Sequence, residues 1–169
     1  MMPAPRGLAA RLRKIKLLLL DVDGVLTDGG VTYSNSGEEL KKFNIQDGYG
    51  IVKLQRLGVK VGIITGRVSK IVERRAAELG ITELRQNLDQ KLSAYEDILR
   101  TVGVTDAEVA YIGDDEPDLL VLARVGFSAA PSDAVPRVRK AVRYVCKRSG
   151  GHGAVREVID LLLAHRRDG

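Results

Sequence analysis

The 169-residue chain contains one cysteine, no tryptophan and no long hydrophobic run. The single Cys146 excludes an internal disulfide and favours a reducing compartment, the cytoplasm. It lies in the apolar run 144–146, which is typical of a short buried strand. The longest apolar run near the N-terminus, Leu17–Leu20, is far shorter than the ~20 residues of a membrane span. The core must therefore come mainly from Val, Ile, Leu and Ala, and we expect no membrane segment.

Positive charge is in excess, with a formal net charge of +5, but aromatic residues make up only 4% of the chain. No basic residues interleave with aromatics, as they do in many nucleic-acid sites, so a nucleic-acid partner is not expected. Hydrophobic residues at 44% and charged residues at 29% are typical of a globular protein. The length suffices for one sizeable core, so we expect a single domain over residues 1–169.

Apolar segments that end in glycine and continue as β-formers occur four times. Glycine is common just past a helix C-terminus because it adopts positive φ without steric cost. The four glycines are Gly58, Gly80, Gly103 and Gly126. Strand-like runs cover residues 16–21, 59–65, 108–113 and 127–130, and apolar spacing predicts helices over 68–79, 92–102 and 155–163. This alternation predicts an α/β fold, a Rossmann-like three-layer sandwich with a mainly parallel sheet.

One stretch interrupts the alternation of strands and helices. Residues 31–33 and 38–43 are separated by the turn-forming sequence Ser34–Gly37, which predicts a β-hairpin. This insertion, at about residues 30–43, lies between the first strand and a helix that begins near Asp47. A glycine-rich tail follows from about residue 149.

Two carboxylates, Asp21 and Asp23, directly follow the buried run Leu17–Leu20. Ligands bind at the carboxyl edge of open α/β sheets, and side chains two apart on an extended chain share a face. The pair suits a magnesium site, because hard cations prefer carboxylate oxygens. It equally suits a nucleophile beside a general acid/base. For this motif alone, a polar turn after a strand is a third interpretation.

A second acidic cluster, at residues 114–118, also follows a buried strand. Acids gathered at two strand ends repel one another unless a cation or substrate is bound, which favours a divalent metal site. Glu116 and Asp118 are interpreted as the start of a helix, with a proline between them in its first turn. That interpretation leaves Asp114 and Asp115 for the site.

Three further residues are candidates for the site. Thr65 and Gly66 end another strand, where a hydroxyl and backbone N–H groups can hold phosphate oxygens. Arg75 falls on the otherwise apolar stripe of the helix predicted over 68–79, an odd place for an unpaired charge. It either lies in a subunit interface, where it reaches a neighbour's substrate, or extends its charge to water from the rim of the stripe.

Taken in order, the segments 21–27, Thr65–Arg67, Lys91 and 113–115 resemble the four motifs of the haloacid dehalogenase superfamily. The resemblance is closer to the 3-deoxy-D-manno-octulosonate 8-phosphate (KDO 8-phosphate) phosphatase family, and it covers roughly residues 14–163. It extends through residues 42–44, 47–51, 109–115 and 150–157. It implies a Mg²⁺-dependent phosphoric monoester hydrolase in which the hairpin stands in place of a cap domain. It also implies a cytoplasmic enzyme of lipopolysaccharide biosynthesis.

The resemblance implies specific roles for the acidic residues. Asp21 attacks phosphorus and becomes an aspartyl phosphate, while Asp23 protonates the leaving oxygen and then activates water. Asp21, the backbone carbonyl of Asp23, and Asp114 bind Mg²⁺. Asp115 supports the metal site from behind these ligands.

The phosphoryl group has its own implied contacts, made by Thr65, the Gly66 backbone and Lys91. Phosphoryl transfer needs in-line positioning and neutralised oxygens, which a lysine and Mg²⁺ supply. Two positions before this lysine depart from the family pattern: Asn87 stands where Gly is common and Gln90 where Asp is common.

The implied substrate is a sugar-acid phosphate monoester, most closely KDO 8-phosphate. Arg67 favours this ester over nonulosonate 9-phosphates, whose phosphatases tend to have Glu at that position. Arg75 is a second candidate to bind the substrate carboxylate, because such enzymes form homotetramers in which a neighbouring subunit covers the site. His152 is either a solvated loop residue or a substrate contact. Two alternatives stay open: a nonulosonate 9-phosphate phosphatase, and a non-catalytic assembly module like those fused to cytidylyltransferases of sialic-acid pathways.

Overall fold

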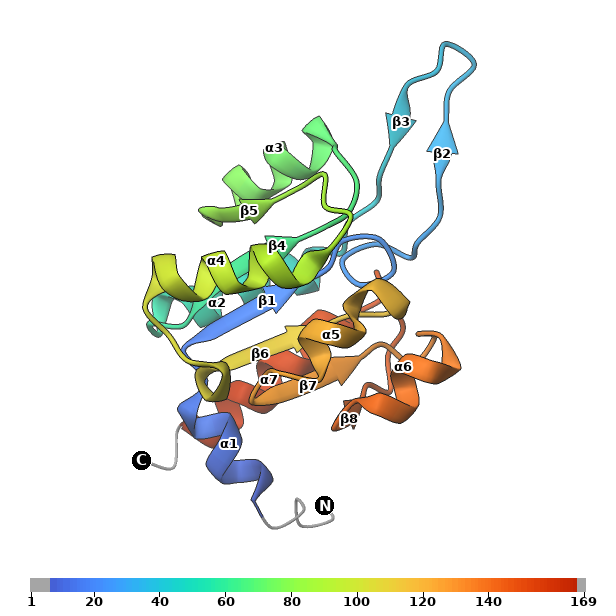
Figure 1. Ribbon diagram of the computed structural model, residues 1–169. Coiled ribbons are helices and arrows are strands. Elements are labelled where there is room, and N and C mark those ends of the chain that lie inside the picture. The colour runs from blue at the N-terminus through green and yellow to red at the C-terminus, as the bar shows by residue number, and fades with distance from the viewer. Residues whose placement is uncertain (1–6, 167–169) are drawn as a thin grey trace.

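A six-stranded parallel sheet forms the centre of the structure, a computed structural model that describes residues 7–166 (Figure 1). The ends of the predicted domain, 1–6 and 167–169, lie outside the described residues. The strand order is β5-β4-β1-β6-β7-β8, and every neighbouring pair is parallel. The strands are β1 Leu17–Leu20, β4 Lys60–Ile64, β5 Glu83–Arg85, β6 Val109–Ile112, β7 Phe127–Ala130 and β8 Tyr144–Val145.

The four leucines of β1 show why this sheet is covered on both faces. Leu18 and Leu20 belong to one hydrophobic cluster, while Leu17 and Leu19 belong to another on the opposite face. Side chains alternate across a strand, so a continuous apolar run places leucines in both layers. All four are fully buried.

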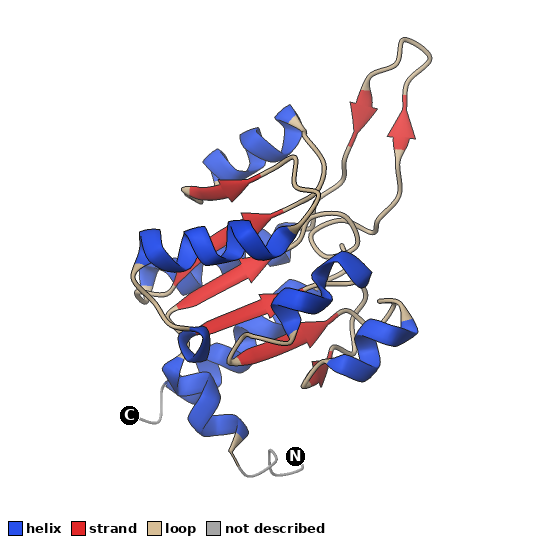
Figure 2. Cartoon of the chain, viewed as in Figure 1, coloured by secondary structure: helices blue, strands red, loops and turns tan. Residues whose placement is uncertain are grey.

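Helices cover the two faces of the sheet, as Figure 2 shows. The cluster containing Leu18 is closed by α1 Leu8–Lys14, α2 Ile45–Arg56, α3 Lys70–Glu78 and α7 Ala154–Arg166. The opposite cluster is closed by α4 Lys91–Val102, α5 Leu119–Leu122 and α6 Pro136–Ala141. The predicted three-layer α/β fold is confirmed. The short elements α1, α6 and β5 are additions that the sequence pattern did not predict.

The predicted hairpin is present and projects away from the sheet (Figure 1). Its strands, β2 Thr32–Tyr33 and β3 Glu39–Leu40, pair antiparallel and form a separate two-stranded sheet. Ser34 closes the turn: its backbone N–H donates to the carbonyl of Glu38 at 2.9 Å, and its hydroxyl accepts from the Glu38 N–H at 3.1 Å.

Three of the four predicted helix-ending glycines, Gly58, Gly80 and Gly103, have positive φ. Gly126 does not, and its role is different. A Cβ at Gly126 would lie 2.4 Å from the carbonyl oxygen of Ala107, so glycine permits a close backbone approach there. Within residues 7–166, no helix has both the length and the apolar character needed to cross a bilayer.

Candidate active site

The predicted site residues converge at the carboxyl edge of the sheet. Asp21 follows β1, Thr65 follows β4 and Asp114 follows β6, and β1 lies between β4 and β6. From β1 the chain continues to β4 and β5 on one side, and it then crosses to β6, β7 and β8 on the other side. The strand order therefore reverses beside β1, and such a topological switch point is where α/β proteins bind ligands. A cavity of about 390 Å³ opens there. The predicted residues that line it are Asp21, Asp23, Thr65, Gly66, Arg67, Lys91, Asp114 and Asp115.

Lys91, the first residue of α4, is 5% exposed, and its ammonium group lies between two carboxylates. Its Nζ is 3.0 Å from Asp21 Oδ2 and 2.6 Å from Asp118 Oδ1. Burial lowers the pKa of Lys91, but the carboxylates of Asp21 and Asp118 outweigh burial, so the pKa lies above its usual value. Lys91 therefore presents a permanent positive charge beside Asp21.

Asp118 is the site residue that the sequence interpretation missed. It does lie in a helical turn, the 3₁₀ segment Glu116–Asp118, but its side chain is fully buried rather than solvated. It accepts hydrogen bonds from Lys91, from the Tyr111 hydroxyl and from the backbone N–H groups of Asp114 and Asp115. Asp118 lies four residues after Asp114, about one helical turn, so its carboxylate reaches the backbone at the start of the same loop. This four-residue spacing is the sequence feature that could have indicated a place for Asp118 in the site.

Three acidic side chains crowd the floor of the cavity. Carboxylate oxygens of Asp21, Asp114 and Asp118 lie within 4.8 Å of one another. Burial, followed by the neighbouring charge of Asp118, raises the pKa of Asp21 to about 6. Burial, followed by the charge of Asp21, raises the pKa of Asp114 to about 8. These carboxylates repel one another, and a bound divalent cation would relieve the repulsion.

The oxygen donors fit Mg²⁺, which binds through carboxylates. Asp118 already accepts four hydrogen bonds, from Lys91, from the Tyr111 hydroxyl and from two backbone N–H groups, so Asp21 and Asp114 are better placed to hold a cation. The loop between β1 and the hairpin has a glycine, Gly24, where it meets Asp114. A Cβ at Gly24 would lie 2.0 Å from Asp114 Oδ2, so only glycine lets Asp114 come this close.

Asp23 and Asp115 do not join this acidic cluster. The Asp23 carboxylate turns toward the hairpin, where Oδ1 accepts from Lys41 Nζ at 2.7 Å. Asp115 is exposed, and its carboxylate accepts from the Glu116 N–H at 2.7 Å. The backbone N–H of Asp115 donates to Asp118 at 3.2 Å, and the supporting role of Asp115 at a metal site stays a prediction.

The two predicted substrate arginines occupy different places. Arg67 lines the cavity and donates to Glu39 of the hairpin at 2.9 Å. Arg75 does not line it: its guanidinium lies 5.7 Å from the centre of the Phe43 ring and 3.4 Å from Glu78. A role for Arg75 in substrate binding therefore requires a neighbouring subunit and stays a prediction.

The loop before Lys91 explains one departure from the family pattern. Asn87 has φ 59°, the only positive φ at a non-glycine residue within 7–166. Asparagine is among the few non-glycine residues that adopt this conformation, so it is compatible with a position where glycine is common.

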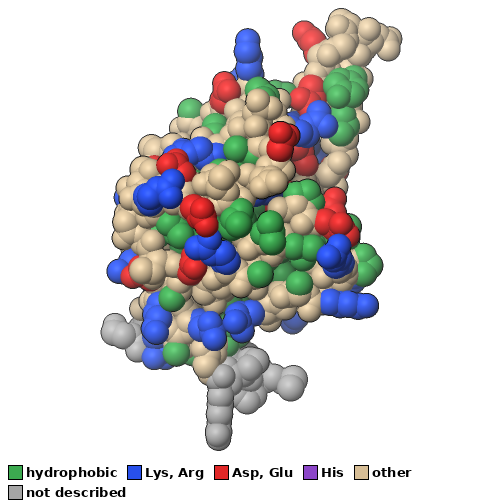
Figure 3. Space-filling model, viewed as in Figure 1, with side chains coloured by type: hydrophobic (Ala, Val, Ile, Leu, Met, Phe, Trp, Pro, Cys, Tyr) green, Lys and Arg blue, Asp and Glu red, His purple; other side chains and the backbone are tan. Residues whose placement is uncertain are grey.

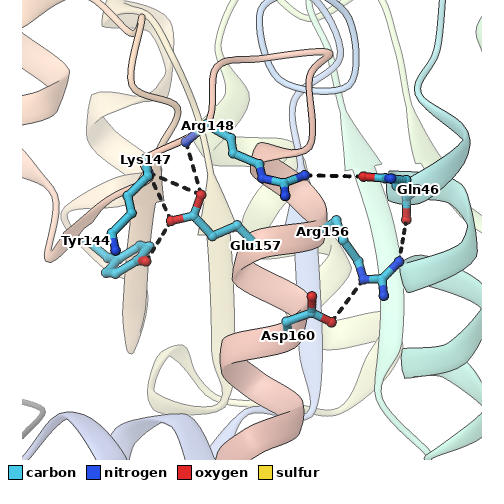
Figure 4. Close-up of a pocket in the computed structure, with 7 residues that line it drawn as sticks. All are labelled: Gln46, Tyr144, Lys147, Arg148, Arg156, Glu157 and Asp160. Atoms are coloured by element: carbon cyan, nitrogen blue, oxygen red, sulfur yellow. Dashed lines mark hydrogen bonds and ion pairs between the residues drawn. The ribbon is translucent and has the colours of Figure 1, made fainter. Parts of the chain in front are cut away.

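The glycine-rich tail packs against the loop that follows Asp21. Gly151 N–H donates to the carbonyl of Val25 at 3.0 Å, and a Cβ at Gly150 would lie 1.9 Å from the Gly24 carbonyl oxygen. Figure 4 shows how Glu157 of α7 holds the segment before the tail. Its carboxylate accepts from the Tyr144 hydroxyl and from the N–H groups of residues 147 and 148. The tail thus supports the Asp21 loop from behind.

His152 makes a local contact within the tail. Its Nδ1 lies 2.9 Å from the carbonyl oxygen of Gly150, its side chain is exposed, and it does not line the cavity. The interpretation as a solvated loop residue fits this placement.

In this site Asp21 and Asp23 follow a central strand and lie beside Thr65, Lys91 and Asp114. This arrangement is typical of haloacid dehalogenase-like hydrolases. A family model for haloacid dehalogenase-like hydrolases matches residues 50–126. The chain is 48% identical, over 161 residues, to the 3-deoxy-D-manno-octulosonate 8-phosphate phosphatase KdsC of Escherichia coli strain K12. That match covers 95% of this chain and 86% of the relative. The chain belongs to the KDO 8-phosphate phosphatase family, which confirms the resemblance noted in the sequence.

Solved structures agree with this assignment. The 3-deoxy-D-manno-octulosonate 8-phosphate phosphatase from Yersinia pestis is 47% identical, with a TM-score of 0.95, and the match covers 98% of this chain and 89% of that one. The enzyme from Moraxella catarrhalis, solved with a magnesium ion, a phosphate ion and KDO, is 40% identical, with a TM-score of 0.92. That match covers 95% of this chain and 92% of the other.

Proposed function

We propose that this chain is a Mg²⁺-dependent phosphatase that hydrolyses KDO 8-phosphate to KDO and phosphate. The observation that carries the proposal is the buried Asp21–Lys91–Asp118 arrangement beside Asp114, in a chain 48% identical to KdsC over nearly its whole length. The Moraxella relative was solved with magnesium, phosphate and KDO together, which supports both the metal and the sugar acid. A cytoplasmic location is part of the proposal and is supported by the free, buried Cys146.

The reaction runs in two steps on Asp21. A carboxylate oxygen of Asp21 bonds to phosphorus as the bond from phosphorus to the sugar oxygen breaks, and Asp23 gives a proton to that oxygen. Asp23, now a carboxylate, takes a proton from the water that attacks phosphorus. The bond from phosphorus to Asp21 then breaks, and phosphate is released.

Charge around the phosphoryl group is balanced by the chain and the cation. Lys91 places its ammonium 3.0 Å from Asp21, so phosphoryl oxygens at this point meet a fixed positive charge. Thr65 and the Gly66 backbone line the same cavity and are the proposed donors to the remaining oxygens. Bound Mg²⁺, held by Asp21, Asp114 and the Asp23 carbonyl, supplies further charge neutralisation.

The proposed substrate is tested by comparing sugar-acid phosphates. We expect KDO 8-phosphate to have a kcat/KM at least about 10-fold above that of a nonulosonate 9-phosphate, because this chain has Arg67 where nonulosonate phosphatases tend to have Glu. Phosphate release from each ester, with glucose 6-phosphate as a neutral-sugar control, measures this. A preference for the nonulosonate ester would reassign the substrate. Release from none of them would favour the non-catalytic assembly module.

We further propose a homotetramer built through the hairpin. Val31, Tyr33 and Leu40 are 49%, 61% and 55% exposed, and Figure 3 shows apolar side chains on the projecting hairpin. An isolated two-stranded hairpin is marginally stable in water, so these side chains would gain from packing against other subunits. Phe43, the last residue of the predicted hairpin, does not belong to this surface, because it packs partly buried against the protein's own core.

Replacement of Tyr33 and Leu40 by serine is expected to shift the protein from tetramer to smaller species, because it removes apolar surface from the contact. Light scattering measures the mass, and Glu38→Ser at the exposed hairpin turn serves as the control. A wild-type monomer with full activity would refute the assembly.

Subunit exchange between Asp21→Asn and Arg75→Ala proteins tests whether sites are shared, because only shared sites regain activity on mixing.

A further inference from the structure

Lys41 is a charged residue whose side chain is withdrawn from solvent. It directly follows β3 of the hairpin, and its side chain is 2% exposed. The preceding Leu40 is 55% exposed. Because side chains alternate along an extended chain, the hairpin turns Leu40 outward and Lys41 toward Asp23.

The ammonium group of Lys41 lies between two carboxylates. Its Nζ is 2.7 Å from Asp23 Oδ1 and 3.3 Å from Glu39 Oε1. Glu39 in turn accepts from Arg67 at 2.9 Å. Four alternating charges therefore run from Arg67, which lines the cavity, through Glu39 and Lys41 to Asp23. A lysine is rarely buried without such partners, because the charge must be compensated.

The contact is selective for one oxygen of Asp23. Among the described residues, hydrogen bonds to the Asp23 carboxylate involve only Oδ1, through Lys41. The Asp23 side chain is 26% exposed, and it lines the cavity. An ion pair that fixes Oδ1 restricts rotation of the carboxylate and leaves Oδ2 available for proton transfer.

We propose that Lys41 is a positioning residue for Asp23, by which the hairpin orients the general acid/base. This inference rests on the proposed phosphatase reaction, in which Asp23 donates a proton to the leaving oxygen and later accepts one from water. Lys41 itself transfers no proton and does not touch phosphorus. It holds the carboxylate at the angle from which both transfers occur.

The leaving group distinguishes this role from a purely structural one. An alkyl ester such as KDO 8-phosphate needs a proton on its leaving oxygen. The leaving group of p-nitrophenyl phosphate is p-nitrophenolate, a stable anion that needs a proton far less. The parameter kcat/KM covers the steps up to the first irreversible one, the transfer to Asp21. A misplaced Asp23 therefore lowers kcat/KM for the alkyl ester much more than for the aryl ester. A loosened fold lowers both alike.

The experiment compares Lys41→Met and Lys41→Gln with Lys42→Met, an exposed lysine next to it. We expect the Lys41 variants to lose at least about 10-fold more kcat/KM on the alkyl ester than on the aryl ester, and Lys42→Met to lose neither. In an Asp23→Asn background, Lys41→Met should cause no further loss on the alkyl ester.

Two outcomes would overturn the inference: equal losses on both esters, or an undiminished effect of Lys41→Met in the Asp23→Asn background. Thermal unfolding of each variant identifies any that fail to fold, and either Lys41 variant alone suffices for the comparison. Wild-type activity separates this inference from the proposed function. If the wild type hydrolyses neither ester, the proposed function fails, whereas uniform losses in an active enzyme remove only the role of Lys41.

Discussion

Asp21→Asn is expected to lower kcat by at least about 10⁴-fold while the protein stays folded. The amide has no anionic oxygen with which to attack phosphorus, so the aspartyl phosphate cannot form. Lys91 would remain paired with Asp118 at 2.6 Å, so the charged centre would survive the substitution. Phosphate release and acid-quenched labelling of the protein by substrate measure the two consequences separately.

The same substitution should not destabilise the protein without metal. Asp21 is 7% exposed beside Asp114 and Asp118, and burial with this repulsion raises its pKa. Asparagine removes one of the crowded charges, so the Tm without metal is expected to stay level or rise. Asp28→Asn, an exposed carboxylate on the same loop, is the matched control and should keep its activity. Substantial turnover in freshly prepared, folded Asp21→Asn protein would contradict Asp21 as nucleophile.

The fold could be predicted largely because its signals are local. The four buried leucines of β1 and the apolar stripes of α4 and α7 follow simple spacing rules, and the structure places each where expected. The three residues of β5 are only half-buried and lack such a run. The six residues of α6 are too few to show a helical stripe. Both depend on tertiary packing, which overrides weak local preference.

The site could be predicted where a motif marks it and not where folding alone assembles it. Asp118 was left out of the predicted site because an acid after a proline is typical of a helix start. Its buried contacts with Lys91 and Tyr111 form only in the folded protein. Lys41 lies 18 residues from Asp23, and no short-range spacing links them. Likewise, the need for glycine at position 24 arises from contact with Asp114, which follows a strand far away in the sequence.

Removal of divalent cations is expected to abolish phosphatase activity, and Mg²⁺ should restore it. Asp21 and Asp114 are the acids assigned to the cation, and without it their charges oppose substrate phosphate as well as each other. Ca²⁺ should inhibit, because its larger and looser coordination misplaces the nucleophile. Activity after treatment with a chelator, followed by titration with each cation, measures this. Full activity in excess chelator would contradict a metal role for Asp114.

Binding of Mg²⁺ should also be visible in stability, with a defined dependence on pH. The folded protein raises the pKa of Asp21 to about 6 and of Asp114 to about 8, above the ordinary 3.8. The folded state therefore favours the protonated acids, and the metal-free protein loses stability as pH rises from about 4 to about 8. Mg²⁺ binds the ionised carboxylates and releases protons, so its stabilising effect should grow over the same range.

At pH 8, a hundred-fold excess of Mg²⁺ over its Kd is expected to add about 3 kcal/mol, or roughly 5–10 °C in Tm. The rise should be much smaller at pH 5. Asp114→Asn should raise the metal-free Tm at pH 8, because it removes the repulsion, and should lose most of the Mg²⁺ response. Asp115→Asn is the matched control, because its exposed carboxylate lies outside the cluster and its backbone N–H still reaches Asp118. A Tm response to Mg²⁺ that is equal at pH 5 and pH 8, or unchanged in Asp114→Asn, would place the cation elsewhere.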